Sequence, residues 1–350
     1  MTTENITLSG NDKIAMIGNL STMLAAGIPI LEVVDSLLED AKKNSKKVLE
    51  TLRSDLIQGR PVHISFAKFP KIFDKVTINI IKASEEAGTL DQTLSDLKEN
   101  IRKDMEFNDQ IRSAFIYPLF ILVIFSGVIV MILTVVIPKI AVVFTSLKAK
   151  LPLPTVILIT MSNALIHYPF IVIASIFAII GIVILLFKTQ RELITHIFLS
   201  LPVIKNVAKE IDLTRFTRSM YLLLNAGIPI TSALILSQEI VMKKDIAEAI
   251  SHARETVVGG QRLSAGMKDA KNIFPSMMIK ITEAGEKTGS LDKSMKDVSE
   301  YLDYQVAKSL KTLTTLLEPL MIVLVGGLVG GIMLAIIAPI YGLISQVSTR

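Results

Sequence analysis

The four histidines are the residues of this chain that most resemble metal ligands. His63, His167, His196 and His252 lie in separate segments, and none has a second histidine three or four residues away. Zinc sites usually combine several such ligands at short, regular spacing. The chain also contains no cysteine, which excludes thiolate ligands, disulfides and a thiol nucleophile. The sequence therefore predicts no metal site and no cofactor.

A glycine-containing segment, AGEKTGS at residues 284–290, has only a superficial likeness to a phosphate-binding loop. Such a loop needs the pattern G-x-x-x-x-G-K-[ST], because its amides and lysine must converge on the phosphates. Here Glu286 follows Gly285, and no glycine stands five residues earlier. We also find no serine–histidine–acid motif and no paired carboxylates that suggest a catalytic cleft. These patterns indicate a protein that is not an enzyme.

Two related turns contain the remaining candidate functional residues. Residues 85–91 read EEAGTLD, and residues 286–292 read EKTGSLD. A glycine can turn the chain there, and the Thr or Ser that follows can cap the next helix. A second interpretation is that a partner protein docks on these turns. The candidate residues are Glu85, Gly88, Leu90, Gly285, Glu286, Gly289 and Leu291.

These turns belong to an internal duplication. The segment AGIPI occurs at residues 26–30 and again at 226–230, and the other related segments recur at an almost constant offset. A repeat of this length predicts one structural unit that is present twice. In each copy a glycine ends the first helix and a proline opens the next. These roles fall to Gly27, Pro29, Gly227 and Pro229.

Both polar regions have helical periodicity. Ile14, Ile17, Leu20, Leu24 and Ile28 recur at steps of three and four residues, which predicts a helix with one apolar face. Further helical patterns follow, without a convincing strand pattern. We therefore expect an all-α protein with two homologous bundles of about six helices each. The last helix of each bundle is expected to continue into a membrane span.

Three apolar stretches predict transmembrane helices, because about 20 apolar residues suffice to cross a bilayer. The N-terminal segment lacks the apolar core of a signal peptide, so the first stretch is expected to be a membrane anchor. The predicted organisation is a cytoplasmic repeat (1–112), a transmembrane helix (113–137), an extracytoplasmic loop (138–166), a transmembrane helix (167–187), a second cytoplasmic repeat (188–315), a third transmembrane helix (316–344) and an extracytoplasmic tail (345–350).

The third span contains candidate packing residues. Gly326, Gly327, Gly330 and Gly331 form two overlapping GxxxG spacings, which predict close approach of another helix. The duplicated prolines Pro118 and Pro319 mark the openings of the first and third spans. Glu318 stands beside the second of them. It is expected at the membrane interface, or else paired, because a charge deep in the bilayer costs roughly 3 kcal/mol or more.

The charges around the spans favour cytoplasmic repeats. Arg102, Lys103 and Arg112 precede the first span, and basic residues also follow the second. The lysines of residues 138–166 argue mildly for the opposite orientation. The net charge is +5, but the sequence contains no run of basic residues typical of nucleic-acid binding. We therefore expect no direct contact with nucleic acid.

Seven segments together carry a family resemblance. They are LAAGIPILEVVDSL, LLNAGIPITSALIL, ASEEAGTLDQTL, EAGEKTGSLDKSM, YPLFILV, EPLMIVL and LPLPT, within residues 12–342. In this combination the chain resembles the F-type inner-membrane platform proteins of type II secretion and type IV pilus assembly systems. Many members carry a longer arm before the first repeat, and only about a dozen residues precede it here.

The resemblance implies a multi-pass protein of the cytoplasmic (inner) membrane, with a cytoplasmic N-terminus and no catalytic residues. It implies that the platform couples a hexameric cytoplasmic assembly ATPase to the insertion of pilin or pseudopilin subunits. Other implied partners are further inner-membrane assembly proteins, the lipid bilayer and copies of the same chain in a homo-oligomer. The alternative is a membrane subunit of an ATPase-driven exporter, and the choice between pilus, secretion pseudopilus and DNA-uptake fibre stays open.

Overall fold

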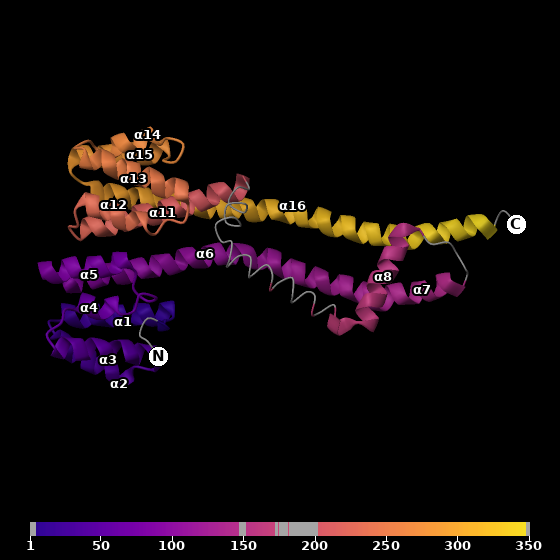
Figure 1. Ribbon diagram of the computed structural model, residues 1–350, viewed down its shortest axis with the longest axis horizontal. Coiled ribbons are helices and arrows are strands. Elements are labelled where there is room, and N and C mark those ends of the chain that lie inside the picture. The colour runs from indigo at the N-terminus through magenta and orange to yellow at the C-terminus, as the bar shows by residue number, and fades with distance from the viewer. Residues whose placement is uncertain (1–4, 147–151, 172–173, 175–180, 182–201, 348–350) are drawn as a thin grey trace. The chain divides into compact units, whose positions relative to one another are not determined.

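The computed structural model describes residues 5–146, 152–171, 174, 181 and 202–347 (Figure 1). Every regular element in these ranges is helical. The chain divides into two compact units: the first comprises Met1–Gln110 and Asn206–Lys308, and the second comprises Ile111–Lys205 and Ser309–Arg350. Most of the predicted second transmembrane helix, residues 167–187, lies outside the described residues.

The first repeat folds into six helices. They are α1 (Gly10–Ala25), α2 (Ile30–Asp40), α3 (Lys43–Ile57), α4 (Val62–Ala67), α5 (Lys75–Ala87) and α6 (Leu90–Met131). Local capping sets some of their limits, because Ser9 accepts a hydrogen bond from the N–H of Asp12 and Asp74 accepts one from Thr77. The short α4, which follows Pro61, was not distinguished by the sequence pattern.

The second repeat has the same order of helices. They are α11 (Pro202–Asn225), α12 (Ile230–Gln238), α13 (Lys244–Val258), α14 (Leu263–Asp269), α15 (Ser276–Thr288) and α16 (Leu291–Val347). Each repeat therefore pairs a short fourth helix with a fifth helix and then a very long sixth one. The predicted all-α fold with two homologous bundles of about six helices is confirmed.

Aromatic and aliphatic side chains fill the core of the first unit. Phe66 and Phe73 are fully buried, with stacked rings whose centroids lie 4.2 Å apart. Ile17 and Leu20, from the predicted apolar face of the first helix, are buried beside them in the same cluster. Burial of a side chain of this size contributes roughly 1.5–3 kcal/mol. The three- and four-residue periodicity thus identified the core-facing stripe of α1.

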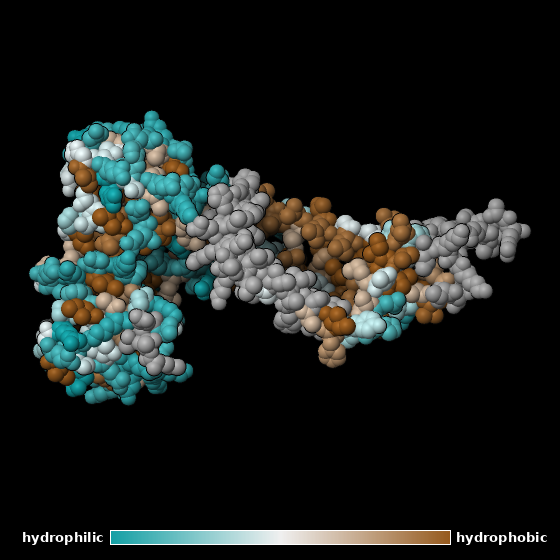
Figure 2. All heavy atoms as spheres, in the orientation of Figure 1, coloured by the Kyte–Doolittle hydropathy of each residue, from teal (hydrophilic) through white to brown (hydrophobic). Residues whose placement is uncertain are grey.

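The second unit contains the apolar parts of α6 and α16. It also contains the π-helix η2 (Ile132–Val136), α7 (Ile137–Ser146) and α8 (Leu153–His167). Two helical stretches, Leu90–Phe144 and Leu291–Ile337, are long and apolar enough to cross a membrane. Only 17% of the most apolar window of each is buried, unlike the core helix of a water-soluble protein. Figure 2 shows the exposed hydrophobic side chains that gather on this unit.

Residues 138–166, predicted as a loop, are largely helical in their described part. Pro138 does not end the first long apolar helix, which continues as α7. The turn before it is π-helical, with the N–H of Ile137 bonded to the carbonyl of Ile132. This wider turn accommodates a proline that cannot donate to the helical ladder.

Close packing between α15 and α16 leads to a stability prediction. A Cβ atom on Gly285 would lie 2.6 Å from the Cβ of Ser294 and 3.2 Å from the Cα of Leu291. Gly285→Ala should therefore lower the free energy of unfolding by about 1–3 kcal/mol, the usual cost of overpacking. Circular dichroism melting of the full chain in detergent micelles measures this loss.

The matched control is Ala284→Ser, on the exposed neighbouring position of α15. It should change the free energy of unfolding by less than about 0.5 kcal/mol. Equal melting temperatures for the two variants would show that α15 and α16 are not packed as tightly as described.

Candidate functional site

The duplicated turns have the same backbone conformation in both repeats. Gly88 follows α5 with φ of 72°, and Gly289 follows α15 with φ of 71°. This left-handed conformation favours glycine, because a Cβ atom would clash with the backbone. Leu90 and Leu291 are the first residues of α6 and α16. The turns thus set the start of the two long helices.

Glu85 binds the N-terminus of a neighbouring helix. Its carboxylate accepts hydrogen bonds from the N–H of Val62 at 2.5 Å and the N–H of His63 at 2.9 Å. The Nδ1 atom of His63 lies 2.6 Å from the same carboxylate. A negative charge is favourable there, because the first N–H groups of a helix lack partners within it. Glu85 therefore holds α4 against the last turn of α5.

Glu286 makes the equivalent contact in the second repeat. It accepts hydrogen bonds from the N–H of Leu263 at 2.5 Å and of Ser264 at 3.2 Å, at the start of α14. We call Glu85 and Glu286, with the helix N-termini they bind, the twin carboxylate caps. Their geometry favours the structural interpretation of the duplicated turns. A docking role for these residues stays a prediction.

The AGIPI segments join the first and second helices of each repeat. Gly27 and Gly227 have positive φ values of 79° and 76° after α1 and α11. Pro29 and Pro229 stand at the N-cap positions of α2 and α12. These four residues lie where the predicted turns place them, away from the twin carboxylate caps in sequence.

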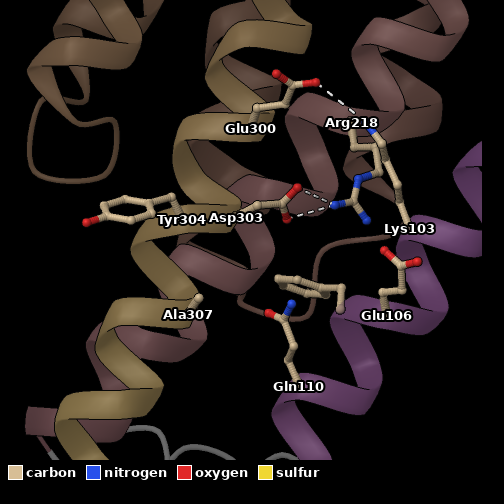
Figure 3. A pocket seen from close by; sticks show the side chains of 9 residues that line it. Lys103, Glu106, Gln110, Arg218, Glu300, Asp303, Tyr304 and Ala307 are labelled. Carbon is tan, nitrogen blue, oxygen red and sulfur yellow. Dashed lines mark hydrogen bonds and ion pairs between the residues drawn. The ribbon is translucent and has the colours of Figure 1, made fainter.

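The structure places a buried ion cluster that sequence patterns did not identify. Arg218 of α11 is only 7% exposed, and it bonds to Asp303 of α16 at 2.6 and 2.7 Å (Figure 3). It also bonds to Asp104 of α6. Its guanidinium also lies 5.4 Å from the ring centre of Phe107. We call Arg218, Asp104 and Asp303 the inter-repeat cluster, because Asp104 comes from the first repeat and the others from the second.

Burial and charge act in opposite directions within this cluster. Burial lowers the pKa of Arg218, but the nearby Asp104 and Asp303 outweigh it and raise the pKa overall. Burial raises the pKa of Asp303 above its usual value, although Arg218 opposes this shift. The guanidinium is therefore firmly cationic, while Asp303 depends on it for compensation of its charge.

A cleft of about 330 Å³ opens beside the inter-repeat cluster. Figure 3 shows Glu106 and Gln110 of α6 on one side and Tyr304 of α16 on the other. Lys103 and Glu300 span it with an ion pair of 3.5 Å. In the described part of the chain, no group of three or more His, Asp or Glu residues could hold a metal ion. The arrangement can fasten two helical repeats together electrostatically.

The signal in the sequence that could have indicated the cluster is a basic residue on the apolar face of a helix. Arg218 stands among the buried residues of α11, close to Phe216 and Met220. At the equivalent position of the first repeat, offset by 200, the residue is Gly18. A cation on a buried helical face needs a partner, but the sequence does not indicate which carboxylates supply it.

The membrane candidates lie on the long helices. Pro118 is within α6, and Glu318 and Pro319 are exposed positions within α16. The glycines of the two GxxxG spacings are exposed on α16. Among the described residues, nothing beyond the local backbone of α16 lies within 4 Å of a Cβ built on Gly326, Gly327, Gly330 or Gly331. Their contact with another helix stays a prediction.

Known proteins match the chain over nearly its full length. Residues 16–138 and 216–339 each match the family described as type II secretion system (T2SS), protein F. The type IV pilus assembly protein PilC of Thermus thermophilus is 30% identical over 95% of this chain and 82% of its own. PilC of Myxococcus xanthus is 28% identical over 96% and 81%. Type II secretion system protein F of Aeromonas hydrophila is 28% identical over 94% and 85%.

The twin carboxylate caps can be tested by removing each carboxylate. Glu85→Ala and Glu286→Ala leave two helix N–H groups without their acceptor, so each should lower the free energy of unfolding by about 1–3 kcal/mol. Melting of the full chain in micelles checks the loss, with Glu86→Ala on the exposed adjacent position as control. Unchanged melting together with lost fibre assembly would instead favour docking on these turns.

The inter-repeat cluster makes a pH-dependent prediction. Arg218→Met leaves Asp303 buried without its cation and should cost about 2–4 kcal/mol at pH 7. The pKa of Asp303, already raised, should rise further, so the folded state then binds the proton more tightly than the unfolded one. Stability is consequently lost as the pH rises through the folded pKa, and the deficit should be smaller near pH 4.

Two further variants sharpen this measurement. Adding Asp303→Asn to Arg218→Met should restore part of the stability, because the uncompensated carboxylate is gone. Arg102→Met removes an arginine that is 54% exposed and pairs along its own helix, so it should cost less than about 1 kcal/mol. If Arg218→Met and Arg102→Met melt alike at pH 7, the cluster does not join the repeats as described.

Proposed function

Because the chain belongs to the type II secretion system protein F family, we propose that it is an inner-membrane platform protein of fibre assembly. In this proposal it couples a hexameric cytoplasmic ATPase to the insertion of pilin or pseudopilin subunits into a type IV pilus or secretion pseudopilus. Its relatives include both pilus assembly and secretion proteins, which supports this class of function. They leave the kind of fibre open.

One structural observation carries the proposal. Each repeat ends in a single helix, α6 or α16, that begins in a bundle and continues into an apolar stretch. A helix transmits rotation and axial displacement along its length, because each backbone hydrogen bond links one turn to the next. We propose that ATP hydrolysis in the partner moves the bundles, and that α6 and α16 convey this movement to the bilayer.

The inter-repeat cluster supports a joint movement of the two bundles. Arg218 joins α11 to α6 and α16, the two helices that continue into the apolar stretches. A force on one repeat would then reach both long helices. The other proposed partners are neighbouring inner-membrane assembly proteins and further copies of the chain.

The proposed topology has three spans, with the N-terminus and both bundles in the cytoplasm. The residues beyond the duplicated pattern, 167–187, would form the additional span. Two repeats in the same orientation can face one side of the membrane only if the chain crosses back between them. The basic residues before the first span favour the cytoplasmic side.

The coupling is tested by breaking the stiffness of one helix. A flexible Gly-Ser-Gly-Ser insertion after Arg112 in α6 should abolish fibre assembly while the protein stays in the membrane at its normal level. The readout is the number of fluorescently labelled fibres per cell, in a host whose own copy of the gene has been replaced. An equal insertion after Lys311 tests α16.

The matched control is the same insertion after Gly59, in the exposed connection between α3 and α4. It should leave assembly near the normal level, because no long helix is interrupted. Normal fibre numbers with a well-folded insertion after Arg112 and after Lys311 would overturn the proposed coupling.

A further inference from the structure

Helix α8 turns two hydroxyl residues inward and large apolar residues outward, and the exposed Thr160 bonds to the carbonyl of Val156 within the helix. Thr155 and Ser162, which share one helical face, are 3% and 1% exposed. On the outer face, Leu153, Ile157 and Met161 are 79%, 58% and 50% exposed. A helix at a water-facing surface turns its apolar stripe inward and its polar residues outward. The outer face of α8 therefore requires an apolar environment.

Ser162 supplies a donor that the first long apolar helix lacks. Its hydroxyl donates a hydrogen bond of 2.5 Å to the carbonyl oxygen of Leu133 in η2. In a π-helical turn that carbonyl would accept from the residue five positions later, which is Pro138. Because proline has no N–H, the carbonyl would otherwise stay unpaired.

Thr155 does the same for the second long apolar helix. Its hydroxyl donates a hydrogen bond of 2.6 Å to the carbonyl oxygen of Ala335 in α16. The donor expected four positions later is Pro339, which also has no N–H. Pro138 and Pro339 are equivalent residues of the duplication. The inward face of α8 thus completes the backbone hydrogen bonding of both duplicated spans at the same proline.

These two hydrogen bonds lie about one bilayer thickness beyond the last charged residues of the long helices. Arg112 and Glu318 are the last charged residues before the apolar stretches. At about 1.5 Å per residue, Leu133 lies about 30 Å beyond Arg112 and Ala335 about 25 Å beyond Glu318. The hydrocarbon core of a bilayer is about 30 Å thick. Any tilt of the helices shortens these distances along the bilayer normal and moves both sites from the distal boundary toward the bilayer centre. Donors from α8 matter there, because lipid offers none.

We propose that α8 is immersed in the membrane, in the leaflet distal to Arg112 and Glu318, with its outer face against lipid acyl chains. Residues 152–171 contain no Lys, Arg, Asp or Glu, in keeping with contact to lipid. Tyr168 directly follows α8, and tyrosine favours the membrane interface. The segment predicted as an extracytoplasmic loop then contains a lipid-embedded brace between two spans.

The absence of cysteine allows a direct test of this location. Single substitutions Ile157→Cys on α8, Val123→Cys on α6 and Ile235→Cys on α12 each receive a nitroxide spin label. Ile235 is an exposed reference position in the first unit, and Val123 is one in the second unit. The full chain is reconstituted in phosphatidylcholine–phosphatidylglycerol vesicles. Collisions with oxygen, which enters lipid, and with a water-soluble nickel chelate are measured by electron paramagnetic resonance.

The label at Ile157 should collide with oxygen about as often as the label at Val123. Its collisions with the nickel chelate should be several-fold fewer than those of the label at Ile235. Met161→Cys, at another position of the outer face, provides the same readout if a label at Ile157 disturbs α8. Nickel collisions equal to those at Ile235 would place α8 in water, and protection from both reagents would show a protein on this face. Either result overturns the proposal.

Discussion

Each repeat ends in a helix that is suited to water at its start and to lipid further along, and the rest of the structure depends on this constraint. The first turns of α6 and α16 pack into polar-surfaced bundles, whereas their later turns expose almost only apolar side chains. In water the bundle is stabilised by burial of one helical face. In lipid every backbone group needs a partner within the protein. The prolines of the apolar parts lack an N–H, so each leaves a helix carbonyl that needs a donor from elsewhere in the protein.

The duplication kept the contacts that define a repeat and varied those that join the repeats. The twin carboxylate caps and the glycine turns occur in both copies, because each copy must position its fourth helix and start its sixth. Arg218 has Gly18 as its counterpart, so only the second copy carries the cation of the inter-repeat cluster. The contacts of this asymmetric residue thus help to join the two similar bundles.

The helical pattern could be read from the sequence with useful accuracy, apart from the short α4 and the helices within residues 138–166. At Pro138 the helix continues as α7, although a proline usually ends a helix. Here a π-helical turn and a hydroxyl from α8 compensate for its missing donor. The site was less predictable. The sequence identified Glu85 and Glu286 as candidates, but it did not show that they accept hydrogen bonds from helix N-termini.

The sequence by itself determined the all-α class, the duplication, the apolar stretches and the glycine turns. The fold class, the apolar stretches and the turns follow from periodicity and backbone preferences, which act over a few residues. The duplication follows from comparing segments about 200 residues apart. Only the tertiary structure decided which groups meet: Arg218 with Asp104, Glu85 with the start of α4, and Thr155 with Ala335. Such partners are tens to hundreds of residues apart. Burial and geometry select among many possible donors and acceptors, and a local pattern does not contain that choice.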